Sequence, residues 1–173
     1  MKEKKKLPEG WRFVKIGDKR VFQIENGIWT GSTPPLQKTR VLRNTNFRNN
    51  GYLDFSDVAE IEIEKNKFER KRLIPNDILI EKSGGGPNTP VGRVVIFKGA
   101  NGVDYGFSNF LARLRITTET ISPEFVHIYL LYQHWSGKTE KIQTQTTNLR
   151  NLDFAKYKSI DIPLPLDKQI QEK

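Results

Sequence analysis

The 173-residue sequence contains no cysteine, one methionine and two histidines. The absence of cysteine excludes disulfide bonds, thiolate-bound zinc and a thiol nucleophile. No apolar run approaches the roughly 18 residues that a membrane-spanning helix needs. The basic N-terminal segment Met1-Lys-Glu-Lys-Lys-Lys6 is not followed by an apolar stretch, so it does not have the pattern of a signal peptide. We therefore expect a cytoplasmic protein that does not associate with membranes.

The sequence also lacks the motifs of common catalytic centres. Glycine-rich residues 83–86 do not belong to a P-loop, because Gly92 is not followed by lysine and serine or threonine. His127 and His134 lie on one predicted helix, roughly 10 Å apart along its axis, which is too far to share one metal ion directly. The Asn/Asp-Pro-Pro-Tyr/Phe motif of amino-methyltransferases is missing as well. We predict no catalytic residue, no metal ligand and no cofactor in this chain.

Positive charge is what the sequence has in excess. Twenty-nine lysines and arginines against 20 aspartates and glutamates give a formal net charge of +9. Such an excess in one domain favours a polyanionic partner, because lysine and arginine displace counterions from phosphates. We find no basic amphipathic helix of the kind that lies on acidic membranes. Nucleic acid is therefore the partner that the charge favours.

The local patterns predict a single mixed α/β (α+β) domain with a strand-rich core and one long packed helix. Residues 59–64 alternate between apolar residues and glutamate, which is typical of a half-buried strand. The apolar runs 78–80 and 94–97 predict buried strands. The three Asn-Gly pairs at 26–27, 50–51 and 101–102 predict tight turns between strands.

The long helix is predicted over residues 123–136. Ser122 is a good N-cap and proline is tolerated at the first helical position that follows it. An apolar stripe with helical spacing is expected to face the core: Phe125, Ile128, Tyr129, Tyr132 and Trp135. Near the C-terminus, Pro163 and Pro165 predict a sharp end to a strand over residues 160–162, because proline lacks a backbone N–H.

Polar loops beside basic charge supply the candidate DNA-binding residues. The amides expected to pair with adenine or other base edges are Asn44, Asn46, Gln143 and Gln145. The arginines expected to pair with guanine are Arg48 and Arg93. The basic residues expected to hold phosphates are Lys65, Lys67, Arg70, Lys71, Arg72 and Lys82. Loop residues that complete the predicted surface are Thr45, Ser83, Gly84, Gly85, Asn88, Thr89, Thr144 and Thr146.

Three segments carry a resemblance to a known family. The C-terminal stretch 143–166 combines a threonine-rich polar run, an Asn-Leu pair, a short helix and Ile162-Pro-Leu-Pro165, and is followed by a helix-prone segment. Leu7-Pro-Glu-Gly-Trp11 and Thr30-Gly-Ser-Thr-Pro34 precede it. In this order, the segments resemble a target recognition domain of the DNA-specificity subunit of type I restriction-modification enzymes.

The resemblance implies a division of the chain and a set of partners. Residues 1–6 would be a solvated basic arm, residues 7–166 the recognition domain and residues 167–173 the start of a conserved spacer helix. Proteins of this kind carry two recognition domains, or one that dimerises, and each domain reads part of a split site in double-stranded DNA. They assemble with methyltransferase subunits, which bring S-adenosylmethionine, and with a motor-nuclease subunit. The residues that read bases do not transfer from the family.

Other functions remain open from the sequence. The chain could be the recognition domain of a fused restriction-methyltransferase, or a stand-alone nuclease. It could also be an RNA-binding module, although the aromatic-rich strand motif of many RNA binders is missing. Finally, the basic charge could be incidental to a protein-interaction module.

Overall fold

The computed structural model describes residues 6–100, 102–146 and 148–173. The predicted basic arm therefore lies outside the described residues except for Lys6, as does Asn101 of the third Asn-Gly pair. The strands are β1 (Trp11–Lys15), β2 (Phe22–Asn26), β3 (Leu36–Leu42), β4 (Ala59–Glu64), β5 (Ile78–Glu81), β6 (Ser83–Gly85), β7 (Val94–Ile96), β8 (Tyr105–Phe107), β9 (Leu111–Ile116), β10 (Gln143–Gln145), β11 (Arg150–Leu152) and β12 (Asp161–Pro165). The helices are η1 (Asn44–Asn46), α1 (Lys65–Lys71), α2 (Pro123–Trp135), η2 (Glu140–Ile142), α3 (Phe154–Lys158) and α4 (Lys168–Gln171).

The centre of the fold is the antiparallel sheet β2-β9-β5-β7. Both of its faces are buried. Ile78 and Ile80 point into the core beneath α2, whereas Leu79 and Val95 point into a second core on the other face. Burial on both faces explains why strands β5 and β7 are continuous apolar runs and do not alternate. The mixed α/β fold and the buried strand at 78–80 are confirmed, and the second predicted strand is present but ends at Ile96, with the buried Phe97 after it.

Helix α2 covers one face of the central sheet with a different stripe from the one predicted. Its start is as predicted, because Ser122 accepts a hydrogen bond from the Phe125 backbone N–H. The buried side chains, however, are Val126, His127, Leu130, Leu131 and Gln133. The stripe prediction was wrong for Ile128, Tyr132 and Trp135, which are 64%, 54% and 62% exposed. The other two members of the predicted stripe, Phe125 and Tyr129, are partly buried and pack against the core beneath α2.

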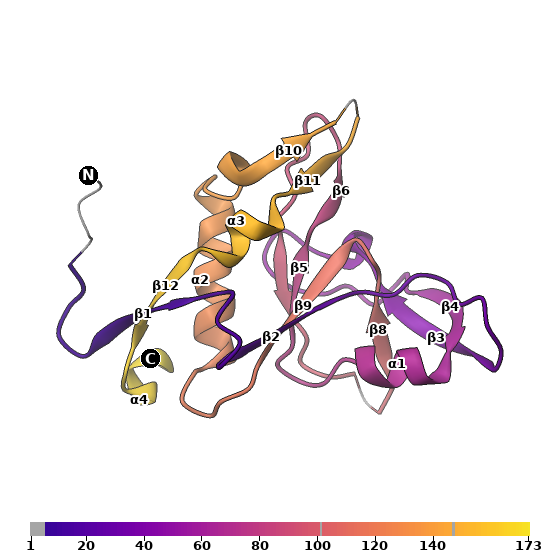
Figure 1. Ribbon diagram of the computed structural model, residues 1–173, viewed down its shortest axis with the longest axis horizontal. Coiled ribbons are helices and arrows are strands. Elements are labelled where there is room, and N and C mark those ends of the chain that lie inside the picture. The colour runs from indigo at the N-terminus through magenta and orange to yellow at the C-terminus, as the bar shows by residue number, and fades with distance from the viewer. Residues whose placement is uncertain (1–5, 101, 147) are drawn as a thin grey trace.

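Three smaller sheets surround the central one (Figure 1). The sheet β4-β3-β8, with α1 against it, lies at the end of the molecule away from the chain termini. The sheet β10-β11-β6 projects above the central sheet, and the pair β1-β12 lies beside α2 near both termini. The predicted alternation in β4 is confirmed, because Ile63 is buried while Glu60 and Glu62 are exposed.

One strand end and one turn differ from what the sequence predicted. Strand β12 does not end before Pro163 but continues through Pro165, with Pro163 opposite Phe13 and Pro165 opposite Trp11. Proline is tolerated there because β12 has a neighbour on one side only, and an N–H that faces away from that neighbour is not needed.

The first Asn-Gly pair is a site of close backbone approach and not a tight turn. Gly27 has no positive φ, unlike Gly51 and Gly102 at φ +84° and +78°. A Cβ atom on Gly27 would lie 1.9 Å from the Ser108 carbonyl oxygen. Glycine is therefore required because the chain after β2 passes directly over the turn before β9.

Candidate nucleic-acid interface

A polar groove of about 500 Å³ lies between the turn after β6, the segment that follows β3 and the C-terminal end of α2. Six residues predicted from the sequence line it together: Asn44, Gly84, Gly85, Asn88, Thr89 and Arg93. Five further lining residues were not predicted from the sequence: Asn49, Glu81, Pro90, His134 and Trp135. Trp135 is exposed at the groove and donates its indole N–H to the Asn49 carbonyl at 3.0 Å.

The glycine-rich turn is held in a defined shape. The Gly86 N–H donates to Thr89 Oγ1 at 2.5 Å, and the Arg150 guanidinium donates to the Pro87 carbonyl at 2.6 Å. Gly84 has φ +96°, and a Cβ atom on it would lie 2.7 Å from Asn44 Nδ2. The absence of side chains at this turn lets its backbone and the Asn44 amide share one surface. Such a surface can approach a second molecule closely.

The predicted polar run of residues 143–146 lies in the hairpin β10-β11, whose second strand pairs with β6. The topology therefore brings this run beside the glycine-rich strand. The Gln143 amide is bound to the backbone of Val91, with Nε2 donating to its oxygen at 2.8 Å and Oε1 accepting from its N–H at 3.2 Å. The exposed members of the run are Thr144, Gln145 and Thr146. Ser83 is hydrogen-bonded to Asn151 of β11.

Two predicted base-reading residues are held by the fold. Asn46 is buried, accepts from the Arg43 N–H at 2.8 Å and donates to the carbonyls of Asp54 and Asp57. Arg93 forms two hydrogen bonds to the buried Glu81 carboxylate at 2.7 and 2.9 Å. That carboxylate raises the pKa of Arg93. The guanidinium also donates to two backbone carbonyls, those of Asn44 and Phe47, at 3.1 Å each.

The other predicted residues of the segment after β3 remain at the surface. Thr45 and Arg48 are exposed, and Arg48 is paired with Asp54. Arg48 also donates to the Thr45 carbonyl at 3.1 Å. Unlike Asn46, the Thr45 side chain can meet a ligand directly, whereas Arg48 would first have to leave Asp54.

Four of the predicted phosphate-binding residues lie on α1, and Arg72 comes directly after it; α1 lies below the projecting sheet β10-β11-β6 in Figure 1. Lys65 and Arg70 are exposed. The other three residues form ion pairs with carboxylates of the same chain: Lys67 with Glu64 at 2.9 Å, Lys71 with Glu25 at 3.2 Å and Arg72 with Asp104 at 3.3 Å. The structure does not bring these five residues into the polar groove.

Lys82 links the two regions. Its Nζ donates to Asn26 Oδ1 at 2.7 Å, and Lys71 Nζ donates to the Asn26 backbone oxygen at 2.5 Å. Burial, and after it the nearby charge of Lys71, lowers the pKa of Lys82. The positive charges of β5–β6 and α1 thus converge at the end of β2.

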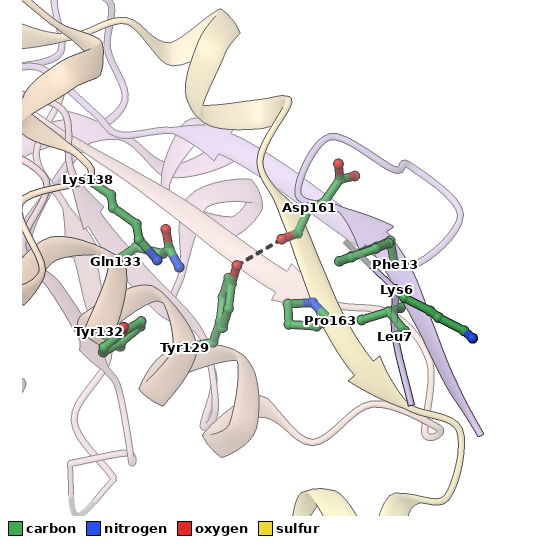
Figure 2. A pocket seen from close by; sticks show the side chains of 9 residues that line it. All are labelled: Lys6, Leu7, Phe13, Tyr129, Tyr132, Gln133, Lys138, Asp161 and Pro163. Atoms are coloured by element: carbon green, nitrogen blue, oxygen red, sulfur yellow. Dashed lines mark hydrogen bonds between the residues drawn. The ribbon is translucent and has the colours of Figure 1, made fainter. Parts of the chain in front are cut away.

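A second and larger hollow, of about 940 Å³, lies between α2 and the β1-β12 pair (Figure 2). Its lining includes Tyr129, whose hydroxyl donates to the Asp161 carbonyl at 2.9 Å, and Tyr132, which lies under Lys138. No predicted DNA-binding residue lines it. Across residues 6–100, 102–146 and 148–173, no group of three or more histidine, aspartate or glutamate side chains could hold a metal ion. No helix in the same ranges is long and apolar enough to cross a membrane.

A groove lined by amides, hydroxyls and glycine backbone, on a domain of strong positive charge, has the chemistry of a sequence-reading nucleic-acid-binding domain. The family comparison agrees and is more specific. The chain belongs to the family of type I restriction-modification DNA specificity domains, whose model matches residues 8–173. The family predicted from the sequence is confirmed. No curated protein sequence matches the chain.

Solved structures share the fold. The HsdS subunit from Thermoanaerobacter tengcongensis matches with a TM-score of 0.61 and 20% identity. The type I restriction-modification S subunit from M. genitalium matches with a TM-score of 0.60 and 15% identity. A structure described for complex assembly and conformational transition of the type I R-M system matches with a TM-score of 0.61 and 20% identity. Each match covers 99% of this chain but only 37–38% of the solved chain.

Proposed function

We propose that the chain is one target recognition domain of a type I specificity subunit, and that it reads one part of a split site in double-stranded DNA through the polar groove. The observation that carries this proposal is the convergence of Asn44, Asn88, Thr89 and the Gly84 backbone on one groove. Among the described residues, the side-chain amides of Asn44 and Asn88 have no hydrogen-bond partner in the free protein. They can therefore meet base edges without breaking internal bonds.

Residues whose polar side-chain atoms are already hydrogen-bonded within the domain have a different role in this proposal. Asn46, Arg93 and Gln143 shape the walls of the groove, because their polar atoms are bound to backbone or to Glu81. Gln145 and Thr146, on the exposed hairpin, extend the reading surface. Lys65 and Arg70 are exposed and pair with no carboxylate among the described residues, so they are best placed to hold phosphates, which position a protein on DNA without reading its sequence.

Family membership supports the wider assembly. The domain would be non-catalytic and would direct methyltransferase subunits, with their S-adenosylmethionine, and a motor-nuclease subunit to the site. Residues from 167 onward would begin the spacer helix. Asp167 caps α4, and Gln171 donates to the carbonyls of Thr120 and Pro165 and accepts from the Ser122 N–H. These bonds fix the direction in which a helix continuing from α4 would leave the domain.

Selection from a randomised duplex library at two salt concentrations tests the proposal. A sequence reader enriches a short motif, and its affinity falls steeply as salt rises. Binding without enrichment would contradict base reading, and no binding at low salt would favour a protein-interaction module. Preferential binding of single-stranded RNA would favour an RNA-binding module, and metal-dependent cleavage of the duplex would favour a stand-alone nuclease.

A further inference from the structure

A small apolar pocket adjoins the polar groove. It has a volume of about 190 Å³ and is formed by the segment after β2, the ends of β3 and β4 and the turn before β9. Its apolar lining includes Ile28, Trp29, Val41, Ile61 and Phe110. Among the described residues that line it, Arg43 is the one charged side chain. Trp29 is 65% exposed at the pocket, although a large aromatic side chain gains free energy from burial.

The pocket and the groove are parts of one surface. A Cβ atom on Gly84 would lie 2.7 Å from Asn44 Nδ2 and 4.0 Å from Phe110 Cδ1. Asn44 and Gly84 line the groove, whereas Phe110 lines the pocket. A ligand that contacts the Asn44 amide beside Gly84 therefore also lies close to Phe110, at the edge of the apolar pocket.

Three residues that line the pocket each have a buried polar atom without a hydrogen-bond partner: Arg43 Nε, the Ser108 hydroxyl and Asn109 Oδ1. Ser108 lines the pocket, is 8% exposed, and its hydroxyl has no hydrogen-bond partner in the free protein. A buried hydroxyl without a partner costs free energy that a bound ligand can recover. Arg43 Nε donates, Asn109 Oδ1 accepts and the Ser108 hydroxyl can do either, so an occupant that fits combines a small apolar group with a neighbouring hydrogen-bond acceptor and donor.

We propose that this pocket reads the 5-methyl group of a thymine in the major groove. Thymine presents a methyl group at C5 and the O4 acceptor on the neighbouring carbon, and apolar contact with this methyl distinguishes it from the other bases. The inference rests on the proposed DNA-reading function. It adds Trp29 and Phe110 as specificity-determining residues. Neither belongs to the polar DNA-binding residues that the sequence predicted.

Replacing single thymines by deoxyuridine tests the inference, because the change removes the methyl group alone. In the duplex enriched by wild-type protein, each thymine is replaced in turn and the dissociation constant is measured. At one position the affinity should fall about fourfold, which corresponds to about 0.8 kcal/mol for one buried methyl-sized group. Phe110→Ala and Trp29→Ala should bind the thymine duplex as weakly as wild type binds the deoxyuridine duplex, and should not distinguish the two.

Ile128→Ala is the matched control, because Ile128 is an exposed apolar residue on α2 that lines neither the pocket nor the groove. It should keep the fourfold discrimination. Circular dichroism establishes that each variant is folded. Full discrimination in both pocket variants, insensitivity at every thymine, or an enriched motif without T·A pairs would each overturn the inference while the recognition function stands. Failure to enrich any motif would instead refute the proposed function itself.

Discussion

The pair of Arg93 and Glu81 provides a quantitative test of how the groove is built. Glu81 is 2% exposed, and its carboxylate receives two hydrogen bonds from Arg93. Arg93→Met would leave that carboxylate buried and unpaired, which costs about 3–5 kcal/mol in comparable cases. Because 24% of the Arg93 side chain reaches solvent, we expect about 3 kcal/mol.

Removing both charges should cost less than removing one. The double variant Glu81→Met/Arg93→Met has no unpaired buried charge and loses mainly the two hydrogen bonds to the carbonyls of Asn44 and Phe47. We expect it to be destabilised by about 1–2 kcal/mol. Urea unfolding followed by tryptophan fluorescence measures both variants.

A matched control separates this effect from the loss of any arginine. Arg40 lies 3.8 Å from Glu60 with both side chains about half exposed, so Arg40→Met should cost at most about 1 kcal/mol. The reasoning is refuted if Arg93→Met costs no more than Arg40→Met, or if the double variant is less stable than the single one. If Arg93 supports the groove and does not read guanine, the double variant should select the same motif as wild type, with an affinity lowered by the loss of the bond to the Asn44 carbonyl.

Three further predictions concern phosphate contact, backbone packing and pH. Lys65→Ala should weaken binding to the enriched and to a scrambled duplex by the same factor and reduce the salt slope by about one, as titrations at several salt concentrations would show; a loss confined to the enriched duplex would contradict this role. Gly27→Ala should destabilise the fold, because its Cβ would meet the Ser108 oxygen, and an unchanged melting temperature would contradict the close approach. Burial lowers the pKa of His127 and His134, so the unfolded chain binds protons more readily and stability should fall as the pH drops below about 6.5. Melting temperatures at pH 7.5 and 5.5 should show this drop in wild type and a smaller one in His127→Gln/His134→Gln; equal drops would exclude the histidines as its source.

Local sequence patterns predicted the elements whose structure depends on neighbouring residues. The alternation of Ile61 and Ile63 with glutamates gave β4, and Ser122 gave the start of α2. The face of α2 that packs on the sheet was not predictable in this way. Apolar residues on both faces of α2 follow helical spacing, and only the tertiary fold decides which of them are buried.

The candidate site was predictable in composition but not in arrangement. Asn44, Asn88 and Thr89 were identified as polar loop residues, and the structure brings them together although Asn44 is far from the others in sequence. The same reasoning cannot distinguish a free amide from one that the fold already uses, as with Asn46. That difference depends on backbone carbonyls supplied by other segments.

The central claim is that the polar groove reads bases. It is tested most directly by the affinity of Asn44→Ala/Asn88→Ala for the enriched duplex and for a scrambled duplex of the same length and composition. We predict a loss of roughly 1–3 kcal/mol per base contact on the enriched duplex and an unchanged affinity for the scrambled one. Equal losses on the two duplexes, or no loss on either, would contradict the claim.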